Sequence, residues 1–295
     1  MEDCILEFKK VSKSFGKNQV LDSIDLSILK GKITGIIGAS GEGKSTILKI
    51  IVSFYKPEKG KVYYQGKEVL KIQQKVKKEF GFSIEEGSFY EDLTVVENLT
   101  HFGKLYGVPI NKLNKRVKGM VYFVGLEKAA NILAKNLSLG MKKRLDLACS
   151  LIHKPSILVL DEPTADLDPL LRKQFLYLIK KINAHGTTVI LTTQIMEEAE
   201  EICDQVCILY NEKIIVQGNI SEIKKKYNSN NLDQVFKKVF SNKRRKTYQE
   251  SKEKKSKFEE IKKEIKKEIK AENPWDILEK RIEKDNKEEK YKDDL

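Results

Sequence analysis

Alternation of apolar and polar residues near the start of the chain predicts two antiparallel strands. Apolar side chains recur at every second or third position from Leu6 to Val11, and again from Ile24 to Ile28. Turn-forming residues fill the segment Ser12 to Asn18 between them. We therefore expect a short antiparallel region before the main fold.

Three further apolar runs predict buried parallel strands, at Lys32–Ile37, Ser156–Leu160 and Thr187–Thr192. The first leads through a glycine-rich loop into helical spacing at Ile47–Ile51, and each of the other two follows a helical stretch. Between about Thr94 and Ala134 the apolar spacing is helical throughout. The pattern predicts an α/β core that a helical insertion interrupts. No apolar run reaches the roughly 18 residues that a membrane-spanning helix needs.

The distribution of charged residues predicts a domain boundary but does not predict a nucleic-acid partner. The chain has 295 residues and a formal net charge of +13 at pH 7. From Ser241 onwards about three-fifths of the residues are charged, whereas the part before it has the charged fraction of an ordinary folded domain. Neither part concentrates its positive charge in one patch, so nucleic acid is not an expected partner.

The four cysteines, Cys4, Cys149, Cys203 and Cys207, form no CxxC pair. The favoured interpretation is that they are buried or unused thiols of a reducing cytosol, with a metal or redox role as the alternative. The first ten residues contain no apolar segment of signal-peptide length. We therefore do not expect the cysteines to take part in the function.

The segment Gly38–Ser45 fits a phosphate-binding loop, since four residues separate two glycines that are followed by a lysine and a hydroxyl residue. Glycines let backbone N–H groups turn towards phosphate oxygens, the lysine bridges the outer phosphates, and the serine hydroxyl binds Mg²⁺. A turn without function is the alternative. The candidate nucleotide-binding residues here are Gly38, Ser40, Gly41, Gly43, Lys44, Ser45 and Thr46.

Asp161 and Glu162 directly follow the predicted strand Ser156–Leu160 and complete such a site. Asp161 would hold Mg²⁺ through water, and Glu162 would polarise the water that attacks the phosphate. Taken alone, two acidic residues at a solvated strand end are common. Together with the phosphate loop about 120 residues upstream, they favour a nucleotide-hydrolysing site.

Four more segments complete a resemblance to a known family: Lys13–Gly16, Leu137–Met141, Pro163–Pro169 and Thr192–Glu200. In order and spacing they resemble the aromatic loop, the signature, the D-loop and the switch region of the ATP-binding cassette (ABC) ATPases. The resemblance covers about residues 6–240. It implies an α/β fold with a P-loop NTPase (RecA-like) core, an N-terminal antiparallel β-subdomain and a helical insertion subdomain.

The resemblance also implies domain boundaries. An ABC-type nucleotide-binding domain would occupy residues 1–228, with its helical subdomain at about 94–153. A C-terminal closing segment would follow at 229–242. A charged helical or disordered tail would occupy 243–295.

Individual roles follow from the same resemblance. Phe15 would stack on the adenine of ATP, although a core aromatic is the alternative. Asp168 would contact the second subunit of a dimer. A helix is expected to begin near Lys142, and the signature lies just before it. The signature residues that would close over the γ-phosphate of a partner's ATP are Ser138, Gly140 and Met141.

Several positions depart from the family pattern. Gln194 stands where the family has its switch histidine, so a hydrogen-bond donor remains but cannot carry a proton. Glu85 aligns with the Q-loop glutamine and adds a negative charge near the γ-phosphate. Leu139 and Met141 alter the signature, and the Cβ of Leu139 is expected to crowd the phosphate. The implied metal ligands are Ser45, Glu85 and Asp161.

Hydrolysis is nevertheless favoured over an inactive site, because Lys44 and Glu162 are retained. Gln194 joins these two as the third catalytic residue implied by the resemblance. The cofactors implied are ATP and Mg²⁺.

Three segments resemble the single-domain ATPase subunits of multidrug-type exporters: Phe89–Leu99, Leu105–Gly107 and Asn231–Phe236. This implies an ATP-hydrolysing motor subunit that dimerises around two ATPs with an identical or different nucleotide-binding domain and drives a separate transmembrane permease. It would be cytoplasmic and held on the inner face of the cell membrane by that permease, which would dock on the loop Gly81–Leu93. Packing within the insertion is the alternative for the aromatics of that region.

Two other classes remain. A regulatory or structural nucleotide-binding subunit with little hydrolysis is the main alternative to the exporter motor. A DNA-repair-type ABC protein is disfavoured, because no long coiled-coil insertion separates the two halves of the site.

The charged tail carries one narrow helical stripe. Phe258, Ile261, Ile265 and Ile269 recur at spacings of three and four among lysines and glutamates. Such a stripe buries little apolar surface, so a solvated helix or a disordered tail is favoured over docking on a partner or on anionic lipid.

Overall fold

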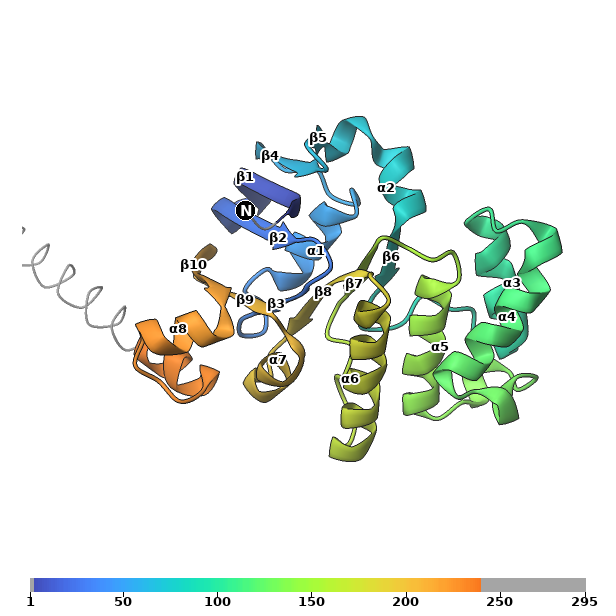
Figure 1. Ribbon diagram of the computed structural model, residues 1–295. Coiled ribbons are helices and arrows are strands. Elements are labelled where there is room, and N and C mark those ends of the chain that lie inside the picture. Colours follow the sequence, from blue (N-terminus) through green and yellow to red (C-terminus); the bar gives the residue numbers. More distant parts are fainter. Residues whose placement is uncertain (1–2, 240–295) are drawn as a thin grey trace, which may run out of the picture. The chain divides into compact units, whose positions relative to one another are not determined.

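The computed structural model describes residues 3–239, and Figure 1 shows the arrangement of their helices and strands. One compact unit, Met1–Phe236, contains all the elements named below, and a second unit begins at Lys237. The predictions for the charged tail from 243 onwards lie outside the described residues.

A six-stranded sheet forms the centre of the first unit, in the order β10-β9-β3-β8-β7-β6. Its strands are β3 (Ile33–Ile37), β6 (Phe80–Ser83), β7 (Ile157–Leu160), β8 (Thr188–Thr193), β9 (Gln205–Tyr210) and β10 (Lys213–Asn219). The first five are parallel, and β10 joins antiparallel at one edge. All residues of β3, β7 and β8 are buried, as parallel strands covered on both faces must be. The predicted α/β fold is confirmed.

Helices cover the two faces of this sheet. Helix α1 (Lys44–Ile51) packs between it and a second sheet, since Leu48, Ile36 and Leu26 share one apolar core. On the opposite face, α6 (Pro169–Ala184) and α7 (Met196–Ile202) share a core with β7 and β8, as Figure 1 shows. The remaining short elements are η1 (Val69–Lys71), α2 (Gln73–Glu79), η2 (Glu127–Ala129), η3 (Ala134–Asn136) and α8 (Ile220–Lys226).

The second sheet is antiparallel, in the order β2-β1-β4-β5. Its strands are β1 (Cys4–Phe15), β2 (Asn18–Leu29), β4 (Lys59–Tyr64) and β5 (Lys67–Glu68). The expected turn at Ser12–Asn18 is too long, because β1 continues to Phe15, which pairs with Asn18. Register shifts between β1 and β2 accommodate the polar residues of this segment within the paired strands. Turn propensity alone does not reveal such shifts. Phe15 therefore ends a strand beside a two-residue turn.

The helical insertion has a core of its own. It consists of α3 (Val95–Leu105), α4 (Ile110–Val124) and α5 (Leu139–Leu151). Thr94 and Glu97 form a capping box that starts α3, and Gly125 ends α4 with a φ of 70°. Helix α5 serves both parts of the unit: Leu145 belongs to the core of the insertion, whereas Leu147 lies in the core beside β7.

Within residues 3–239, no helix is long and apolar enough to cross a membrane. The same part of the chain contains no group of three or more His, Cys, Asp or Glu side chains placed to hold a metal ion.

The cysteines give a prediction about thiol reactivity. Burial raises the pKa of Cys207 to about 12 and holds the pKa of Cys149 well above its ordinary value, whereas Cys4 is exposed. At about pH 8 we expect a thiol reagent to modify Cys4 readily in the folded protein and to leave Cys149 and Cys207 unmodified, since only the thiolate is nucleophilic. Mass spectrometry of labelled peptides checks this, with denatured protein as the control that labels throughout.

Candidate functional site

The predicted phosphate loop connects β3 to α1, and either its backbone conformation or its close packing favours glycine at three positions. Gly41 and Gly43 have φ values of 80° and 98°, in the left-handed region that favours glycine. A Cβ on Gly38 would lie 2.8 Å from the carbonyl oxygen of Leu209, and one on Gly43 would lie 2.8 Å from Cγ1 of Val20. The loop conformation therefore requires glycine, and α1 begins at the next residue, Lys44.

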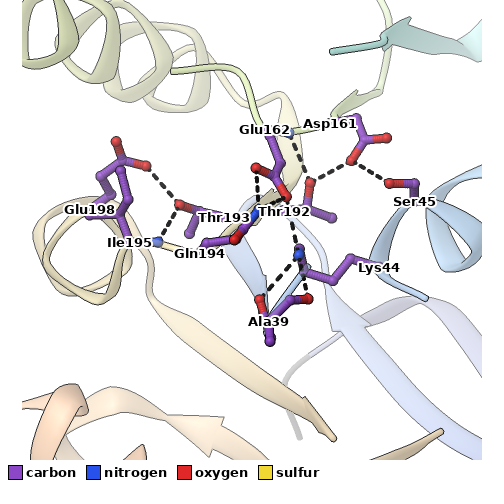
Figure 2. Close-up of polar contacts among 11 residues, drawn as sticks. Ala39, Lys44, Ser45, Asp161, Glu162, Thr192, Thr193, Gln194, Ile195 and Glu198 are labelled. Carbon is purple, nitrogen blue, oxygen red and sulfur yellow. Dashed lines mark hydrogen bonds and ion pairs between the residues drawn. The ribbon is translucent and has the colours of Figure 1, made fainter. Parts of the chain in front are cut away.

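Lys44 lies at the centre of the site and is only 4% exposed. Its Nζ donates to the carbonyl oxygens of Gly38 at 3.1 Å and of Ala39 at 3.0 Å. The same nitrogen lies 3.1 Å from Oε1 of Glu162 (Figure 2). The lysine and the acidic pair, which are far apart in the sequence, thus occupy one site.

Asp161 contacts two hydroxyl groups from different elements. Ser45 Oγ donates to its Oδ1 at 3.1 Å, and Thr192 Oγ1 donates to the same oxygen at 2.7 Å (Figure 2). The contacts arise because the carboxyl ends of the neighbouring parallel strands β3, β8 and β7 lie at one edge of the sheet. The Thr192 hydroxyl also accepts from the backbone N–H of Glu162 at 2.9 Å.

Gln194 is held against Glu162. Its Nε2 donates to both carboxylate oxygens of Glu162, at 2.9 and 3.0 Å. Glu162 itself has a φ of 42°, an uncommon backbone conformation for a residue with a Cβ. Glu162 therefore contacts both of the other predicted catalytic residues, Lys44 and Gln194.

Glu198 is a member of the site that the sequence analysis missed. It is 3% exposed and accepts hydrogen bonds from Thr164 at 2.7 Å and Thr193 at 2.8 Å, and Arg172 Nε lies 3.1 Å from its Oε1. It thus joins the segment after Glu162 to the residue before Gln194. In the sequence it belongs to an acidic run on a helix, which resembles a solvated face, and only its place beside the apolar positions of α7 indicates burial.

Two of the three predicted metal ligands lie together. Ser45 and Asp161 are bonded to each other, and a hydroxyl with a carboxylate fits Mg²⁺, which keeps several positions for water and phosphate oxygens. Glu85 lies in the exposed loop after β6, where its carbonyl oxygen accepts from Lys143 at 2.7 Å. Among the described residues, its carboxylate makes no hydrogen bond to either of the other two.

Comparison with known proteins shows the family of the chain. The family model described as "ABC transporter" matches residues 21–165. The Nod factor export ATP-binding protein I of Ralstonia nicotianae is 35% identical over 219 residues, which cover 74% of this chain and 68% of that protein. The chain belongs to the ATP-binding proteins of ABC transporters.

Two other ABC proteins extend the comparison. The probable multidrug ABC transporter ATP-binding protein YbhF of Escherichia coli is 35% identical over 222 residues, which cover 75% of this chain but only 38% of YbhF. CbiO1 of Clostridium perfringens, described as part of the ABC transporter complex CbiONQ, matches with a TM-score of 0.70 and 26% identity over 81% of this chain and 95% of that one. The resemblance to ABC ATPases is thus confirmed.

The segment Leu137–Met141, which resembles the ABC signature, lies at the start of α5, and this helix begins at Leu139 and not near Lys142 as expected. The reason is that Ser138 caps the helix, with its Oγ accepting from the N–H of Met141 at 3.4 Å. Leu139 is 45% exposed, whereas Gly140 is buried, and a Cβ there would lie 3.0 Å from Leu171. The leucine that replaces a family glycine therefore lies in the first turn of the helix with its side chain accessible.

Two more predicted site residues, Asp168 and Phe15, lie at the ends of elements. Asp168 caps α6 by accepting from the N–H groups of Leu170 at 2.9 Å and Leu171 at 3.0 Å. Phe15 is 43% exposed and packs edge-on against Tyr55, with 5.1 Å between ring centroids. The alternative that Phe15 is a core aromatic is wrong, because the strand end leaves its ring accessible.

Proposed function

We propose that this chain is the ATP-binding and ATP-hydrolysing motor subunit of a two-component ABC exporter. The observation that carries the proposal is the position of Glu162 at the carboxyl end of β7, in contact with both Lys44 and Gln194. A relative named for Nod factor export and another named as a probable multidrug transporter subunit support the exporter class.

In this proposal each contact has a chemical role. The N–H groups of Gly38–Ser45 and Lys44 bind the phosphates of ATP, and Phe15 stacks on the adenine. Ser45 and Asp161 would hold Mg²⁺, and Glu85 would join them from its loop; the ion would neutralise phosphate charge when bound. Glu162 polarises the attacking water, and Gln194 orients Glu162 through its amide.

Full activity requires a second nucleotide-binding domain, identical or different. In the proposed dimer, Ser138, Gly140 and Met141 of one subunit cover the γ-phosphate bound by the other, and Asp168 contacts the partner. The exposed position of Leu139 at the start of α5 is consistent with a surface that meets another subunit.

A separate membrane permease is the second partner in the proposal. An apolar groove of about 470 Å³ lies between α2 and the end of α3, and its lining includes Phe82 and Tyr106. This groove borders the loop Gly81–Leu93, which makes it the place where a coupling helix would dock. The subunit would then be peripheral on the inner face of the cell membrane.

A regulatory subunit with little hydrolysis is the second candidate function. The bonds of Gln194 to both carboxylate oxygens of Glu162 favour it, because an amide engaged in this way is less free to reach a phosphate. Phosphate release by the purified chain with ATP and Mg²⁺ separates the two candidates. Turnover of about 1 per second or more, within the usual range of enzyme rates, supports the motor.

The departures from the family pattern give a matched test. We expect Gln194→His and Leu139→Gly each to raise the rate of phosphate release about threefold or more, because histidine restores a group that carries charge and glycine removes a Cβ near the phosphate. Gln217→His, an exposed glutamine in β10, is the control and should change nothing. A flat response in both variants would mean that neighbouring residues compensate for the departures.

A further inference from the structure

One face of α5 is bonded to the loop that follows β6. Asp146 is 2% exposed, and its carboxyl group accepts from the N–H of Ser88 at 2.6 Å and bonds to the hydroxyl of Ser83. Ser83 is the last residue of β6 and Ser88 lies in the middle of the loop. A single side chain of α5 therefore holds two points of the loop, on either side of Glu85.

Two more contacts come from the preceding turn of the same helix. Lys143 donates to the carbonyl oxygen of Glu85 at 2.7 Å, and Lys142 Nζ lies 3.0 Å from Oε1 of Glu91. Helix geometry places positions 142, 143 and 146 on one face, since residues three and four apart are neighbours. The loop is therefore attached to α5 along much of its length.

The contact of Asp146 is the strongest of these, because it is buried. A carboxyl group removed from water is costly unless it is hydrogen-bonded, and burial accordingly raises the pKa of Asp146, which the bonds to Ser83 and Ser88 oppose. Lys142 and Glu91 are more exposed, and such pairs contribute little. A buried acid whose bonds run to one loop specifies the position of that loop.

We propose that Asp146 is a positioning residue that locks the loop carrying Glu85 to the helix that begins at the signature. The hydrogen bonds of Asp146 to Ser83 and Ser88, which we call the lock, make the loop with Glu85 and the start of α5 move together. Glu85 faces the ATP of this chain, whereas Ser138, at the other end of the lock, faces the ATP of the partner subunit. The proposal rests on the proposed function, because it assigns the two ends to two ATP sites.

The test compares Asp146→Ala, Asp146→Asn and Ser83→Ala with the wild-type chain. Hydrogen exchange is measured for peptides covering 84–92 and 138–143, and kcat and KM for ATP are measured on the same preparations. Asp146→Ala is expected to speed exchange in both peptides about tenfold and to lower kcat about tenfold, while KM stays within about twofold, since Lys44 and Phe15 are untouched.

Asp146→Asn is the conservative variant. Its amide oxygen accepts from Ser88 and its NH₂ group donates to the oxygen of Ser83, so kcat is expected to return to within about threefold of wild type. Adding Ser83→Ala to Asp146→Ala is expected to lower kcat no further, because the two residues form one interaction.

Ser150→Ala is the matched control for Ser83→Ala. It removes another buried hydroxyl from the same region, one that donates to the carbonyl oxygen of Leu147 in its own helix, and it should leave exchange and kcat unchanged. If Asp146→Ala does not fold, the comparison of Ser83→Ala with Ser150→Ala decides the question. An effect of Ser83→Ala on both peptides, greater than that of the control, supports the lock.

The proposal is overturned if Asp146→Ala melts at a lower temperature but keeps the wild-type kcat, or if exchange rises only in 84–92. Either result would make Asp146 a contributor to stability alone. If the wild-type chain releases no phosphate, the proposed function fails. The hydrogen-exchange rates of peptides 84–92 and 138–143 then test independently whether Asp146 holds the loop and the helix together.

Discussion

Lys44→Ala is expected to weaken ATP binding about tenfold or more, because it removes the positive charge that faces the outer phosphates. The side chain is buried, and its contact with Glu162 holds it at the phosphate loop. Titration with a fluorescent ATP analogue measures the effect.

Lys56→Ala is the control for this variant. Lys56 is exposed and follows α1 on the same segment of chain, so its removal changes the net charge equally without touching the loop. Equal affinity in Lys44→Ala and the wild-type chain would end the assignment of the phosphate loop. A melting temperature measured without nucleotide separates lost binding from lost folding.

Glu162→Gln is expected to retain ATP binding within about threefold and to lose phosphate release by about 100-fold or more. Glutamine has nearly the same shape but cannot accept a proton from water, and it keeps a carbonyl oxygen for Gln194. Because ATP then persists in the site, we also expect an ATP-bound dimer. Light scattering with and without ATP detects it.

Glu201→Gln, an exposed position on α7, serves as the control. Phosphate release that persists in Glu162→Gln would mean that another group polarises the water. If Glu162→Gln binds ATP, loses hydrolysis and stays monomeric, the catalytic role of Glu162 is supported. The expectation of a symmetrical ATP-bound dimer is then not supported.

The difference between the two expected results distinguishes their roles. Lys44 acts on the nucleotide itself, so its loss appears in binding. Glu162 acts on water, so its loss appears in turnover. The ion pair between them, at 3.1 Å, means that each variant also changes the surroundings of the other, and the double variant is not expected to show additive effects.

Local patterns predicted much of the fold. Continuous apolar runs gave β3, β7 and β8 to within a residue or so, because strands buried on both faces must be apolar throughout. The apolar spacing between about Thr94 and Ala134 predicted a helical insertion for the corresponding reason that one helical face is buried, but it did not separate α3 from α4. Boundaries set by caps were less accurate: the start of α5 depends on the Ser138 side chain, and the end of β1 depends on its register with β2.

The local sequence was enough to predict the available chemistry, namely a glycine loop with Lys44 and Ser45 and two acidic residues after a buried strand. Its spacing could not reveal that Glu198 is buried between two segments, or that Asp146 bonds to Ser83 and Ser88. These contacts depend on the tertiary fold, because all of them except that of Thr193 with Glu198 join residues tens of positions apart. An acidic residue on a helix has the same local pattern whether it faces water or a buried hydroxyl, and it is the packing of other elements against it that makes the difference.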